Sequence, residues 1–158
     1  MLVGDGQKRW YFRKVGTVDL AGTVSKTVLE TKQVVLKDRS MCDQEDAWLF
    51  GGNSRMGYWF GSIQCESDEL QNKTQQTQNV WNFIADSTKL EIVTEVQVSY
   101  NSDRYGGYAS SRRSSTENKT IIWELKRLTD EKLHIRSVSS FKGGDSIRIE
   151  EHFFEHGL

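Results

Sequence analysis

The chain has 158 residues, with 21 Lys and Arg against 22 Asp and Glu, thirteen glycines and no proline. Its formal net charge of −1 gives no electrostatic case for binding nucleic acid or an anionic membrane surface, and no apolar run is long enough to cross a bilayer as a helix. The length and the lack of a Pro-rich linker predict one domain over residues 1–158.

The N-terminal half alternates between aromatic segments and polar ones. It begins MLVGDGQKRW, a start typical of a chain from which a leader peptide has been removed. Segments rich in Val, Thr and aromatic residues predict strands, whereas region 19–31 fits either a short helix or a strand. The polar stretch 66–78, ESDELQNKTQQTQ, is expected to be a loop.

The C-terminal half shows clear two-residue alternation in four segments: LEIVTEVQV (90–98), TIIWELKRL (120–128), KLHIRSV (132–138) and SIRIEEHFF (146–154). Successive side chains of a strand point to opposite faces, so each segment predicts a strand. In the last one, Ile147, Ile149 and Phe153 share one face, and Arg148, Glu150 and His152 share the other.

Polar residues separate these strands at 85–88, 129–131 and 143–145, as short hairpin connections do. The stretch 101–117, NSDRYGGYASSRRSSTE, is polar, rich in Gly and Ser and aperiodic, and is expected to be a long mobile loop. Arg and Tyr side chains within it are candidates for ligand or partner specificity: Arg104, Tyr105, Tyr108 and Arg112.

Four Trp-x-apolar pairs recur along the chain, and each delivers two large groups to one face of a strand. Their side chains either pack a common core or line a ligand cavity; the candidates are Trp10, Phe12, Trp48, Phe50, Trp81, Phe83 and Trp123. Eight to ten short antiparallel strands fit a closed barrel or a two-sheet sandwich, and short turns favour the barrel. The expected fold class is therefore all-β, a single antiparallel up-and-down barrel of about eight strands.

The order of motifs resembles a known family. Cys42 precedes an acidic pair and an aromatic hairpin that ends at Cys65, and the segments WNFIADSTKLEI (81–92) and IWELKRLTDEKLHI (122–135) follow. This order resembles the lipocalin-like (calycin-type) domains of secreted Bacteroidetes lipoproteins over residues 8–154. The resemblance implies a lipid-anchored or secreted barrel in the periplasm, at the outer membrane or at the cell surface. It also implies that Arg148 packs on the first-strand tryptophan, Trp10.

Two cysteines that flank a hairpin suit a disulfide better than a metal, which supports an extracytoplasmic location. A Cys42–Cys65 bridge would stabilise the fold by about 3 kcal/mol in the chain-entropy model. The alternative is two separate buried thiols.

Motifs of catalysis and of cofactor or metal binding are missing from the sequence, so a non-enzymatic protein without cofactor is expected. His152 and His156 are four apart on a strand, about 13 Å, and are expected to be exposed rather than to share a metal. The predicted function is to hold a small apolar or amphipathic ligand in or at the mouth of the barrel. The alternative is a packed barrel that binds a protein or glycan partner through its loops.

Overall fold

The computed structural model describes residues 2–3, 6–41, 43–59, 79–102 and 111–157, and for 95–102 and 111–117 it describes the backbone. Within these residues there are nine strands, in chain order β1 (Gln7–Ala21), β2 (Lys37–Asp38), β3 (Ala47–Gly51), β4 (Arg55–Trp59), β5 (Asn79–Ile84), β6 (Lys89–Ser102), β7 (Ser111–Leu128), β8 (Lys132–Phe141) and β9 (Ser146–His156). One α-helix, α1 (Lys26–Thr31), and two 3-10 turns, η1 (Asp43–Glu45) and η3 (Lys142–Gly144), complete the described elements.

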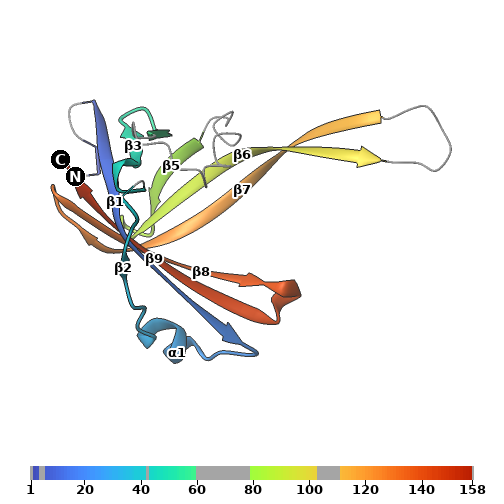
Figure 1. Cartoon of the computed structure of the whole chain (residues 1–158), viewed down its shortest axis with the longest axis horizontal. Helices are drawn as coiled ribbons and strands as arrows, with labels where there is room; N and C mark the ends of the chain where they lie inside the picture. Colours follow the sequence, from blue (N-terminus) through green and yellow to red (C-terminus); the bar gives the residue numbers. More distant parts are fainter. Residues whose placement is uncertain (1, 4–5, 42, 60–78, 103–110, 158) are drawn as a thin grey trace.

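The strands form a closed barrel. From β3 to β9 each strand pairs antiparallel with the next, and β1 pairs with both β3 and β9, which closes a ring of eight strands. The ninth strand, β2, adds two residues to the edge of β1. The prediction of an all-β, up-and-down barrel of about eight strands is confirmed (Figure 1).

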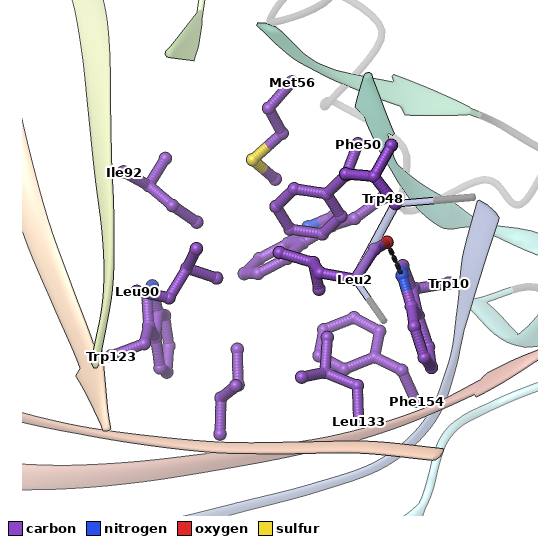
Figure 2. Close-up of a cluster of buried hydrophobic side chains, with 12 residues drawn as sticks. Leu2, Trp10, Trp48, Phe50, Met56, Leu90, Ile92, Trp123, Leu133 and Phe154 are labelled. Carbon is purple, nitrogen blue, oxygen red and sulfur yellow. Dashed lines mark hydrogen bonds between the residues drawn. The ribbon is translucent and has the colours of Figure 1, made fainter. Parts of the chain in front are cut away.

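The core includes residues near both ends of the chain, Leu2, Trp10 and Phe154, and the two ends lie close together at one end of the barrel (Figure 1). Figure 2 shows side chains from opposite walls pointing at one another there. Leu2 enters this cluster, and its carbonyl accepts a 2.9 Å hydrogen bond from Trp10 Nε1. The buried members are Leu2, Val3, Trp10, Trp48, Phe50, Met56, Leu90, Ile92, Trp123, Leu133, Ile135 and Phe154. Because apolar burial is the main favourable term in folding, this cluster holds the barrel closed.

The seven aromatic candidates all lie in or against this core. Trp10, Trp48, Phe50 and Trp123 are buried within it, and Phe12, Trp81 and Phe83 pack against it while remaining partly accessible. Trp81 also donates through Nε1 to the Gly51 carbonyl at 3.1 Å. These three partly exposed rings therefore mark the edge of the core.

Helix α1 lies on the side of β8 and β9 that is away from β6 and β7 (Figure 1). Region 19–31 thus contains both the end of β1 and a helix, which begins after the N-cap Ser25. Arg136 of β8 donates to the carbonyls of Leu29 and Lys32, at 2.5 and 2.9 Å, and so ties the helix end to the barrel. The chain then passes so close to Gly16 that a Cβ there would lie 2.5 Å from the Val35 carbonyl oxygen.

Along β9, polar side chains face the interior of the barrel, which is the reverse of the usual arrangement of apolar side chains inside and polar ones outside. The predicted alternation is confirmed, but Arg148, Glu150 and His152 share the inward face with Phe154. Ile149 lies on the opposite face and is fully buried. The outer face of β9 is buried at Ile149 and at Glu151, whose carboxylate pairs with Arg136, and Arg136 in turn contacts α1.

The expectation of a loop over 101–117 is wrong at both ends. β6 continues to Ser102 and β7 starts at Ser111, with a ladder that pairs Ser102 with Ser111 and runs on to Lys89 and Glu124. The three short connections predicted at 85–88, 129–131 and 143–145 do lie between strands, where they were expected.

The loop 66–78 and both cysteines, Cys42 and Cys65, lie outside the described residues, so the disulfide stays a prediction. In the part of the chain that is described, no helix has the length and apolarity to span a membrane.

Candidate ligand site in the barrel interior

A histidine lies at the boundary between the apolar core and the polar half of the interior. The centroid of the His152 ring is 5.3 Å from that of Trp123, 5.9 Å from Phe12, 6.0 Å from Phe154 and 6.4 Å from Trp48. His152 is only 6 % exposed. The expectation that His152 is exposed is therefore wrong, because its face of β9 turns inward.

Both ring nitrogens of His152 face protein groups. Nε2 forms a short hydrogen bond with the Glu150 carboxylate, and Nδ1 lies 3.5 Å from Nη2 of Arg39. A guanidinium can only donate and a carboxylate can only accept, so the neutral ring carries its hydrogen on Nε2. With both nitrogens engaged, His152 acts as a bridge between an acidic and a basic group.

Glu150 is held in its charged form by these neighbours. The hydrogen bond from His152 keeps the pKa of Glu150 below its usual value of 4.5, and the charges of Arg148 and Arg39 act in the same direction. Partial burial opposes this shift, but it is the smaller effect. The interior of the barrel therefore carries an ionised carboxylate beside an imidazole and a guanidinium.

The lowered pKa of Glu150 predicts a pH-dependent contribution to stability. Because the unfolded chain takes up this proton first, the contribution is complete above pH 4.5 and is lost as the pH falls through the lower pKa of the folded state. The Glu150 side chain is 35 % exposed, so we expect at most about 1 kcal/mol. Urea unfolding at pH 6.0 and 3.5 should show a larger loss for the wild type than for Glu150→Gln. Equal losses would contradict the prediction.

Arg39 enters the interior from the chain that follows β2. Its backbone N–H donates to the Arg13 carbonyl, and its carbonyl accepts from Gln44 Nε2, both at 2.8 Å. Its guanidinium carbon lies 5.0 Å from the Phe12 ring centroid. Two backbone anchors thus direct a cationic side chain over the aromatic boundary.

A second arginine lies further from the core on the inward face of β9. Arg148 donates to both carboxylate oxygens of Asp19 on β1, at 2.8 and 3.1 Å, and lies over the Phe141 ring. The expectation that Arg148 packs on Trp10 is wrong, because Lys8 takes that place, with Nζ 4.5 Å from the Trp10 ring centroid. Arg148 therefore forms an exposed bidentate pair with Asp19, away from the core.

Two uncharged polar residues also face inward. Tyr58 is paired with Trp48 across β3 and β4, their rings meet edge to face at 6.4 Å, and Tyr58 remains 40 % exposed. Burial of part of its ring raises the pKa of the Tyr58 hydroxyl above 10.0. Asn79, paired with Met56, is 2 % exposed, and its Oδ1 has no hydrogen-bond partner among the residues that the structure describes.

The remaining residues predicted from sequence lie elsewhere. Arg104, Tyr105 and Tyr108 lie outside the described residues, and Arg112 pairs with Asn101 in the β6–β7 ladder. His156 donates through Nδ1 to the Arg9 carbonyl at 2.9 Å, near the chain ends. Among the residues that the structure describes, no group of three or more His, Cys, Asp or Glu side chains could hold a metal ion.

Comparison with known proteins found no match among protein-family models, curated proteins or solved structures. These comparisons therefore assign no function, and the residues of the site are the structural basis for proposing one. Sequence reasoning found the aromatic wall but missed Arg39, Glu150 and His152. The signal for the last two was present in the polar face of SIRIEEHFF, whereas no pattern around Arg39 distinguishes it from a solvated surface arginine.

Proposed function

We propose that the protein is a non-enzymatic binding protein that holds a small amphipathic molecule inside the barrel. The observation that carries the proposal is the composition of one continuous interior, in which aromatic rings give way to Arg39, His152 and Glu150. A merely structural interior would have no need of charged groups, since burying them costs free energy unless they are well paired. The resemblance to lipocalin-like domains supports the same function and a location outside the cytoplasm.

The apolar part of the ligand would lie on the partly accessible rings at the edge of the core. Phe12 and Trp81 pack against the buried cluster yet keep exposed surface, and Tyr58 extends this wall. Ligand sites are typically apolar surfaces with a few placed polar groups. Asn79 Oδ1 supplies one such group, an acceptor for a hydroxyl or amide N–H of the ligand.

The proposal is tested by two neighbours on β4 that face opposite sides. Tyr58 points inward, whereas Trp59 points outward, under the Arg9 guanidinium, and the two have similar exposure, 40 % and 43 %. We expect Tyr58→Ala to weaken binding of the neutral fluorescent probe N-phenyl-1-naphthylamine about threefold to tenfold, because one ring contact is lost. Trp59→Ala should leave binding unchanged.

Mass spectrometry of solvent extracts from native protein provides the second measurement, and a co-purified amphipathic compound is expected. Failure of the wild type to bind the probe, together with empty extracts, would overturn the proposal and favour the packed barrel. Equal loss of binding in both variants would also count against an interior site.

A further inference from the structure

The guanidinium of Arg39 has more hydrogen-bond donors than acceptors around it. Its Nε is buried without a partner, its Nη1 lies 3.8 Å from the Asp43 carboxylate, and its Nη2 lies 3.5 Å from His152 Nδ1. Charge-assisted hydrogen bonds of arginine are normally about 2.7–2.9 Å long. A guanidinium carries five N–H donors, so within the described residues Arg39 has no acceptor at ordinary distance.

The carboxylates of this region each accept from another donor, and the Asp43 carboxylate lies 3.8 Å from Arg39 Nη1, beyond ordinary hydrogen-bond distance. Glu150 accepts from His152, Asp43 accepts from the Ser40 hydroxyl at 2.8 Å, and Asp19 accepts twice from Arg148. Buried polar groups in proteins are nearly always paired, and an exception calls for an explanation. The explanation with the fewest assumptions is an acceptor that arrives with the ligand.

The surroundings of Arg39 define what kind of acceptor fits. A guanidinium matches the geometry of a carboxylate or comparable oxyanion, and it repels a cation. The Phe12 ring lies beside it, and His152 continues the contact toward Trp48 and Trp123. A small inorganic anion would pair with Arg39 without contacting these rings, whereas an organic anion would both pair with Arg39 and contact the rings.

We infer that the ligand is an organic anion whose carboxylate binds Arg39 and whose apolar body lies on Phe12 and the other partly accessible rings of the interior. The inference rests on the proposed function and narrows its ligand to one charge class. In this proposal His152 and Glu150 position the Arg39 side chain. The Glu150 carboxylate orients the His152 imidazole, and Nδ1 of the imidazole faces the guanidinium. Arg39 is the residue that contacts the ligand.

The test compares three competing ligands that have the same twelve-carbon hydrocarbon chain and different head groups. Dodecanoate, dodecanol and dodecylammonium would each displace bound N-phenyl-1-naphthylamine at pH 8.0 from the intact protein. We expect dodecanoate to act at about tenfold lower concentration than dodecanol, because a hydrogen-bonded ion pair is added. Arg39→Gln should abolish this difference while dodecanol binding persists. Arg148→Gln, which removes another inward-facing arginine, should leave the difference intact.

The outcomes separate this inference from the proposed function. Binding of the neutral probe with equal displacement by all three compounds, or strongest displacement by dodecylammonium, would overturn the anionic ligand and leave the interior site standing. Absence of binding by the neutral probe would overturn both. The comparison of head groups on the wild type decides the matter even where Arg39→Gln fails to fold.

Discussion

Replacing Trp10 by alanine is expected to lower the free energy of unfolding by about 3–5 kcal/mol. Trp10 is fully buried in the core cluster, and its indole N–H donates to the Leu2 carbonyl (Figure 2). The substitution leaves a large cavity and removes the partner of a buried carbonyl, and both effects destabilise the folded state. It also detaches the N-terminal residues that fill this end of the barrel. Urea unfolding followed by circular dichroism would measure the loss.

Trp59→Ala is the matched control, because it removes the same side chain from the outer face of the barrel. Trp59 is 43 % exposed and contacts the Arg9 guanidinium, so its loss is expected to cost about 1 kcal/mol or less. If both variants lost the same stability, the assignment of inner and outer faces would be wrong.

Arg136→Met is expected to destabilise the protein by about 3–5 kcal/mol, since it breaks a buried ion pair from one side. Arg136 and Glu151 have side chains that are 5 % and 8 % exposed, and their Nη1 and Oε1 atoms are 2.8 Å apart. The same guanidinium holds the carbonyls of Leu29 and Lys32. Among the described residues, its loss therefore leaves Glu151 with His134 as its remaining side-chain partner, and it releases the end of α1. Hydrogen exchange of α1 amides should rise together with the fall in unfolding free energy.

Two further variants show whether burial is the cause. Arg148→Met removes an arginine whose pair with Asp19 is exposed, and its effect is expected to be much smaller. Arg136→Met combined with Glu151→Leu should recover much of the loss, because no uncompensated charge remains in the buried site. A double variant no more stable than the single one would show that the contact with α1, rather than the ion pair, dominates.

The barrel could be predicted from the sequence because its walls repeat one simple pattern. Pairs such as Trp48 with Phe50, or Trp81 with Phe83, put two rings on one face, and the structure turns each of these faces inward. Short polar connections between alternating segments then leave few topologies other than a meander. Local patterns decide these features, so a single sequence contains them.

The polar site could not be predicted because it depends on contacts between distant segments. Alternation along β9 shows that Glu150 and His152 share a face, but it does not show which face is the inner one. The outer face is recognisable only in the structure, where Arg136 on that face contacts the end of α1 and Ile149 is fully buried. Arg39 joins the site only because Arg13 and Gln44 anchor its backbone.

The β6–β7 extension was missed for a related reason. Residues 111–117 are polar and lack alternation, and such sequences usually form loops. Once Leu90 and Trp123 fix the register, each further pair only extends an existing ladder. A strand can then continue through residues that have little strand preference of their own.

The pairing of β1 with β9, from Trp10 and His156 to Ala21 and Ser146, joins the first and last strands of the barrel. On the ribosome, β1 is made before the other strands of the barrel, and β9, with which it forms its longest pairing, is made last among them. Its row of rings stays unshielded during that delay, which exposes nascent chains to association with each other or with chaperones. Closure of this one seam should therefore be a late step of biosynthesis, and the slow one, as non-local pairing generally is.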